Sequence, residues 1–113
     1  MSDWHVHLAK QAEDDLRDLY EHVAFDLLEP GVAKRLIQRI WKRVEKLNNL
    51  PQSFAPYPKE PWKSRGLRRV NSGKHAVFFI PDEETKTVIV IRVLYGGRDI
   101  EQILVDMLDD SSE

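Results

Sequence analysis

Basic side chains in the second half of the chain are the residues best suited to chemistry with an anion. Four arginines lie in segments with the residue pattern of β-strands, or shortly after one: Arg68, Arg69, Arg92 and Arg98. A guanidinium group binds phosphate or carboxylate through two parallel hydrogen bonds. Because neighbouring residues of a strand face opposite ways, only one of Arg68 and Arg69 can face a buried sheet surface. The pattern predicts an anion site at one end of a sheet, built from one of that pair together with Arg92 and Arg98.

Arg92 also has a purely structural interpretation. It lies between Val90 and Leu94 in an apolar run, where an unpaired charge would be costly. An acidic side chain from a helix could neutralise it. The other basic residues of this half could simply be solvated: Lys59, Lys63, Arg65 and Lys74. These interpretations stay open at the level of sequence.

The histidines and glycines add little catalytic chemistry. His5 and His7 share one face of an expected strand, but no third ligand is evident and the chain has no cysteine, so we expect no metal. His75 opens an expected strand, where it would cap or hydrogen-bond locally. Gly96-Gly97 lacks the Lys-Ser/Thr pair that follows the glycines of a phosphate loop. We expect no cofactor.

The elements that position these residues follow from hydrophobic periodicity. Apolar residues at every second position over residues 4–8 predict a strand. Apolar residues spaced three and four positions apart predict helices over residues 9–27 and 33–47. A turn at Glu29-Pro30-Gly31 would join them. Four prolines in residues 51–64 exclude a regular helix or a central strand there, and the aromatic residues among them suggest a loop packed against the body.

The rest of the chain predicts a strand meander and a short helix. Strands are expected over residues 67–70, 75–80 and 87–95. In the last of these, Val88, Val90, Arg92 and Leu94 would share one face, and apolar residues on both faces predict a central strand. Asp99 and Gln102 have capping-box spacing before a helix over residues 100–107.

The resulting order is β-α-α-β-β-β-α, an α+β fold with a helical hairpin packed on a mainly antiparallel sheet. We expect a single domain over residues 1–108 and a frayed acidic tail over residues 109–113.

Composition places this domain among cytoplasmic proteins. The absence of cysteine excludes disulfides and thiolate clusters, and neither a membrane span nor a secretory signal is visible. The formal charge of −2 hides a segregation: residues 1–30 and 81–113 each carry −6, whereas residues 31–50 and 51–80 each carry +5. Since binding follows local potential, a basic surface remains available for an anionic partner.

Three segments carry a resemblance to a known family. Residues 68–79 resemble the Arg-Arg-x-x-Ser-Gly-x-His-x-Val-Phe-aromatic segment of the RelE/ParE toxin superfamily. Residues 90–100 look like its closing strand and turn, and residues 12–16 are similar to the start of its first helix. The resemblance spans nearly the whole chain, and the expected order of elements agrees with it.

This resemblance implies the toxin of a type II toxin–antitoxin pair, neutralised by a cognate antitoxin. RelE-like members cut messenger RNA in the ribosome with basic residues and usually a Tyr or His near the C-terminus. ParE-like members instead inhibit DNA gyrase by binding. No His or Tyr follows Arg98, and the family's terminal aromatic falls near Leu104. The segment Ser72-Gly73-x-His75 also favours the ParE branch.

The leading hypothesis is therefore a toxin that binds gyrase. Its target- or anion-binding residues would be Arg68, Arg69, Arg92, Arg98 and His75. The basic surface is where we expect both antitoxin and target. Alternatives are a ribosome-dependent mRNA endoribonuclease, an inactive homologue that only binds an antitoxin, and a generic anion-binding module. The ribonuclease would have to recruit Lys63, Arg65, Arg98 and Tyr95.

Overall fold

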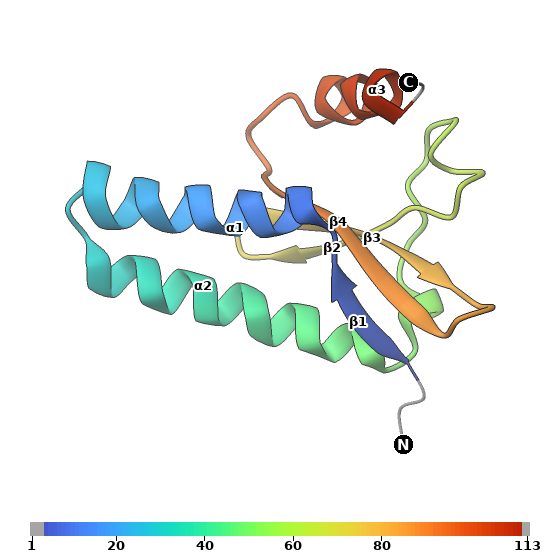
Figure 1. Cartoon of the computed structure of the whole chain (residues 1–113), viewed down its shortest axis with the longest axis horizontal. Helices are drawn as coiled ribbons and strands as arrows, with labels where there is room; N and C mark the ends of the chain where they lie inside the picture. Colours follow the sequence, from blue (N-terminus) through green and yellow to red (C-terminus); the bar gives the residue numbers. More distant parts are fainter. Residues whose placement is uncertain (1–3, 112–113) are drawn as a thin grey trace.

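The computed structural model describes residues 4–111, in which two helical layers enclose a four-stranded sheet (Figure 1). The strands are β1 (His5–Leu8), β2 (Arg68–Ser72), β3 (His75–Asp82) and β4 (Thr87–Tyr95). The helices are α1 (Lys10–Glu21), α2 (Pro30–Glu45) and α3 (Ile100–Ser111), and a π-helical turn, His22–Asp26, extends α1. Short 3-10 turns cover Lys46–Asn48 and Pro51–Ser53. The predicted order β-α-α-β-β-β-α and the α+β class are confirmed.

The sheet has the order β1-β4-β3-β2. β1 runs parallel to β4, while the β4–β3 and β3–β2 pairs are antiparallel, so the sheet is mainly antiparallel as expected. β4 is central and covered on both faces. Val88 and Val90 join the core beneath the α1–α2 hairpin, whereas Ile91 and Leu94 join the core beneath α3.

An irregularity in β4 changes which residues share a face. Phe78 pairs with Arg92 and Phe79 with Val90, so Ile91 is an extra residue in the ladder. Such a bulge interrupts the alternation of faces. The prediction that Leu94 shares a face with Val88, Val90 and Arg92 is therefore wrong: Leu94 packs on the α3 side, and Val93 packs in the core beneath the hairpin.

The helical hairpin forms as the apolar stripes predict, with a correction at its tip. Pro30 and Gly31 belong to the first turn of α2, where the missing N–H of proline costs no helical hydrogen bond. The connection runs instead through residues 27–29, and Leu28 adopts a left-handed φ of 56°. The hairpin buries Ala12, Leu16 and Ile40 against the sheet.

The proline-rich segment packs against the body, which confirms the expectation from its aromatic residues. Tyr57 and Trp62 are buried, and the Trp62 indole Nε1 donates to the carbonyl of Leu104 in α3 at 2.9 Å. The Tyr57 N–H also donates to the Leu67 carbonyl at 2.8 Å. The loop thereby covers the outer edge of β2 near its start and ties that edge to α3.

Helix α3 begins with half of the predicted capping box. The Gln102 backbone N–H donates to Asp99 Oδ1 at 3.2 Å, but the Gln102 side chain bonds Asp106 instead of returning to Asp99. The helix continues to Ser111, beyond the predicted end near residue 107 and into the tail that we expected to fray; residues 112 and 113 lie outside the described residues. None of the described helices combines the length and the apolar character needed to cross a membrane.

Candidate target-binding site

His75 and Tyr95 form the centre of the candidate site at the end of β4. They are paired across β3 and β4, and their rings meet edge to face with centroids 5.7 Å apart and an interplanar angle of 65°. Gly97 makes this arrangement possible, because a Cβ there would lie 2.5 Å from Tyr95 Cε2. The Gly96 N–H donates to the Lys74 carbonyl at 2.8 Å. The glycine pair thus fits closely around the tyrosine ring and is anchored to the β2–β3 turn.

An open cavity of about 200 Å³ brings Arg98 beside these two rings. Its wall continues onto α1 and the π-helical turn, which supply Asp15, Asp18 and His22. The predicted residues His75, Tyr95 and Arg98 therefore do come together. The facing wall carries carboxylates, so this cavity has mixed charge and is not a purely basic pocket.

The His75 ring is partly buried at the start of β3. Its Nδ1 is buried and has no hydrogen-bond partner among the described residues, and burial lowers the pKa of His75 below its ordinary value of 6.5. Desolvation penalises the imidazolium form. We therefore expect the side chain to contribute ring packing and hydrogen bonding, with no positive charge near neutral pH.

Arg92 is occupied by an internal ion pair. Its Nε and Nη2 donate to the two carboxylate oxygens of Asp15 at 2.8 and 2.7 Å, and the Val93 N–H donates to the same carboxylate at 2.9 Å. Both side chains are largely buried, with 16% and 11% exposure for Arg92 and Asp15. Hydrogen bonding to Asp15 raises the pKa of Arg92. The structural interpretation of Arg92 is confirmed, because Asp15 of α1 neutralises the charge that the sequence offered to an anion.

Arg68 and Arg69 face opposite ways, as the pleat requires. Arg68 is half-buried and donates to the carbonyl of Phe54, so it holds the proline-rich loop. Arg69 lies on the other face with its guanidinium carbon 5.5 Å from the centre of the Phe78 ring, and its Nε donates to Asn71 Oδ1 at 3.1 Å. Arg69 is the member of the pair that remains available to a ligand.

Lys63 and Arg65 lie in a different part of the molecule. The Arg65 guanidinium stands over the Trp62 ring at 5.4 Å, in the loop that packs against α3. In Figure 1 this loop and the β2–β3 turn lie at opposite ends of the sheet. The four residues that a ribonuclease would have to combine are thus split, with Tyr95 and Arg98 in one cavity and Lys63 and Arg65 outside it.

Two arginines of α2 join the β2–β3 turn, which sequence reasoning missed. Arg43 Nε donates to the backbone carbonyl of Asn71 at 3.2 Å, and Arg39 Nη1 lies 3.9 Å from the position that a Cβ on Gly73 would occupy. In the sequence both stand between the apolar positions of the predicted second helix, on its polar face. Their i, i+4 spacing was visible, but their approach to the turn depends on how the hairpin crosses the sheet.

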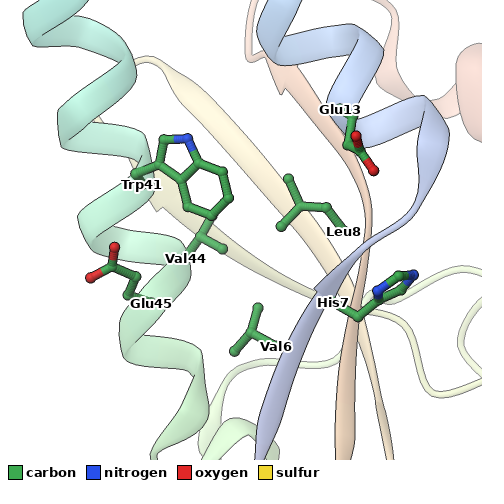
Figure 2. Close-up of a pocket in the computed structure, with 7 residues that line it drawn as sticks. All are labelled: Val6, His7, Leu8, Glu13, Trp41, Val44 and Glu45. Atoms are coloured by element: carbon green, nitrogen blue, oxygen red, sulfur yellow. The ribbon is translucent and has the colours of Figure 1, made fainter.

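A second surface lies beside β1, where apolar side chains are flanked by the carboxylates of Glu13 and Glu45. A cavity of about 400 Å³ opens between β1 and the helices, and Figure 2 shows Val6 and Leu8 pointing toward Trp41 of α2. The Trp41 side chain is 40% exposed. Residues 4–111 contain no group of three or more His, Cys, Asp or Glu side chains arranged to hold a metal ion.

Several solved structures with the same architecture come from toxin–antitoxin systems. The chain matches a structure of the chromosomal ParDE system from P. aeruginosa with a TM-score of 0.67 and 22% identity over 81% of this chain and 95% of that one. It matches a chain of the RelBE2 complex from Mycobacterium tuberculosis with a TM-score of 0.61 and 20% identity, covering 81% and 96%. It also matches the isolated RelE toxin of E. coli with a TM-score of 0.53 and 16% identity, covering 93% and 98%. These likenesses define the class as a RelE/ParE-like fold.

The family follows from the sequence itself. A family model described as the ParE toxin of the type II toxin–antitoxin system parDE matches residues 6–100. The chain therefore belongs to the ParE toxin family. A search of curated proteins returns no match.

Proposed function

We propose that this chain is a toxin that inhibits DNA gyrase by binding to it and that a cognate antitoxin neutralises it. The observation that carries the proposal is the ParE family match over residues 6–100. The mode of action is binding, because the residues of a ribonuclease centre are dispersed. Phosphodiester cleavage needs an acid or base and charge-stabilising groups around one phosphate, and Lys63 and Arg65 lie outside the cavity of Tyr95 and Arg98.

A second candidate, a RelE-like ribosome-dependent mRNA endoribonuclease, is favoured by one specific observation. Tyr95, His75 and Arg98 share a cavity, and a half-exposed tyrosine beside an arginine could act on a phosphate without the loop residues. This candidate requires that Arg98→Ala abolish cleavage of ribosome-bound mRNA.

In this proposal the antitoxin binds at the edge of β1, and not on the basic surface where the sequence led us to expect it. β1 is an edge strand. The N–H groups of His5 and Ala9 donate to the carbonyls of Lys86 and Val90, each at 2.9 Å, so the intervening residues Val6 and Leu8 direct their backbone groups outward. An extended antitoxin segment could pair with this edge and place an apolar side chain against Trp41. The relatives solved as ParDE and RelBE toxin–antitoxin complexes support a protein partner of this kind.

The test is a direct comparison of two activities of the purified chain. We expect inhibition of gyrase supercoiling at stoichiometric toxin, relief of that inhibition by the cognate antitoxin, and intact ribosome-bound mRNA. Codon-linked mRNA cleavage that Arg98→Ala removes would instead establish the ribonuclease. If neither activity appears and the antitoxin still binds, the chain is an inactive homologue and the gyrase proposal fails.

A further inference from the structure

Four basic side chains gather around the β2–β3 turn without any acidic partner. Arg39 and Arg43 come from α2, Arg69 from β2, and Lys74 from the turn itself; we call them the turn cations. Among the described residues none of the four forms an ion pair. Three of them are exposed and Arg69 is half-buried. Like charges held together at a surface repel one another, so the group creates a local positive potential that a chain of net charge −2 does not otherwise suggest.

Asn71 organises two of these groups. Its backbone carbonyl accepts from Arg43 Nε at 3.2 Å, while its Oδ1 accepts from Arg69 Nε at 3.1 Å. Both contacts orient a guanidinium without neutralising its charge, and both use Nε, so the terminal Nη nitrogens lie outside these bonds. Guanidinium groups pre-oriented in this way lose less side-chain entropy when they bind phosphate oxygens.

The turn itself brings the other two cations close. Gly73 adopts a left-handed φ of 57°, and the Arg39 guanidinium reaches this turn, with Nη1 at 3.9 Å from the position that a Cβ on Gly73 would occupy. The backbone of Lys74 is fixed because its carbonyl accepts the Gly96 N–H. Beside the turn is an open cavity of about 280 Å³ whose lining includes Arg69, Lys74 and the Gly96-Gly97 pair and contains no carboxylate.

We propose that the turn cations bind the phosphate backbone of duplex DNA. Exposed cations spread around a sheet edge, over a helix and a turn, suit a polyanion that offers several phosphates, whereas a single small phosphate would be enclosed more deeply. The choice of duplex DNA as the source of phosphate rests on the proposed function, since gyrase acts on DNA. The toxin would then contact both the enzyme and the DNA that the enzyme holds.

The experiment measures binding of the full chain to a fluorescein-labelled duplex of about 20 base pairs, by anisotropy, between about 50 and 200 mM KCl. The test variant is Arg39→Gln/Lys74→Gln, because both side chains are exposed and form no hydrogen bond that supports the fold within residues 4–111. The matched control is Lys10→Gln/Arg17→Gln, which removes the same charge from exposed positions of α1. We expect the test variant to bind about tenfold more weakly at low salt and to lower the salt slope by about 1.8, roughly 0.9 for each phosphate that the variant no longer neutralises. The control should stay within about twofold of the wild type.

Three results would overturn the proposal. The first is a control that loses as much affinity as the test variant, which would indicate a net-charge effect. The second is a wild-type chain that binds inorganic pyrophosphate or single-stranded RNA through Arg39 and Lys74 more tightly than it binds the duplex. The third is duplex binding that is absent or indifferent to both substitutions.

Gyrase takes no part in these measurements. A chain that binds duplex DNA through the turn cations but leaves supercoiling unaffected would therefore refute the gyrase proposal alone.

Discussion

Arg92 and the four turn cations look alike in the sequence but have opposite environments in the fold. Arg92 is largely buried, and Asp15 engages it through two hydrogen bonds. The turn cations are exposed or half-buried and have no acidic partner within residues 4–111. A buried charge must be paired to be tolerated, whereas an exposed one stays solvated and available to a ligand. The comparison separates a cation that holds the fold from cations available for binding.

The Asp15–Arg92 pair also explains how the first helix is placed. Asp15 lies on α1 and binds both the Arg92 side chain and the Val93 backbone, at the point where the β4 bulge disturbs the ladder. The carboxylate therefore joins α1 to the central strand. Without it, α1 and the cavity of His75, Tyr95 and Arg98 would lose a common support.

The strongest test of this contrast is Asp15→Ala. It leaves the buried Arg92 without a counter-ion, so we expect a loss of about 3 kcal/mol or more in the free energy of unfolding. Urea denaturation of the variant and the wild type measures this loss in the free energy of unfolding. The double variant Asp15→Leu/Arg92→Met should recover most of the loss, because matched apolar groups can replace a buried pair. A loss below about 1 kcal/mol for Asp15→Ala would show that Arg92 reaches water and is not buried in solution.

A smaller effect is expected from Gly97→Ala. The added Cβ would collide with Tyr95, and because that ring is 47% exposed it can swing aside at a cost of about 1 kcal/mol. The predicted signature is loss of the ring contact between Tyr95 and His75, seen as changed NMR shifts of the imidazole protons. Gly31→Ala in the first turn of α2 is the control, since a Cβ there meets only ordinary contacts. Unchanged imidazole shifts in Gly97→Ala would argue against the close packing of the glycine turn.

A still smaller, pH-dependent effect should separate His75 from the charged residues around it. Because its pKa in the folded state lies below 6.5, the unfolded chain takes up a proton that the folded chain refuses. The contribution of His75 to stability is therefore present above pH 6.5 and is lost as the pH falls. We expect the free energy of unfolding to drop less between about pH 7 and 5 in His75→Gln than in the wild type. Asp15, Asp18 and His22 share the cavity and remain in both proteins, so the difference reports His75; equal slopes would refute the prediction.

The smallest expected change in stability belongs to the turn cations. Arg39→Gln/Lys74→Gln should leave the free energy of unfolding within about 0.5 kcal/mol of the wild type, while DNA binding falls as proposed above. Thermal and urea unfolding at equal ionic strength provide the measurement. A clear destabilisation would place these residues with Arg92 among the supports of the fold, and a clear stabilisation would measure the repulsion among them.

Much of the architecture could be predicted from local patterns. The helical stripes of α1 and α2 and the alternation of β1 each follow a period that only one kind of element satisfies. The double-sided apolar character of β4 correctly indicated its central position. The candidate cavity was partly predictable, because His75, Tyr95 and Arg98 stand at the ends of expected strands. The bulge at Ile91 was not, because an extra residue in a strand leaves no reliable mark in the hydrophobic pattern.

The sequence by itself determined the elements, their order, the segregation of charge and the membership of the ParE family. Only the tertiary structure decided which cations are paired. Asp15 and Arg92 are 77 residues apart, and Arg43 meets Asn71 across 28 residues, so neither contact follows from a local period. Whether an arginine is neutralised or left to attract a ligand depends on which side chain the fold brings within hydrogen-bonding distance and on how much water remains around it.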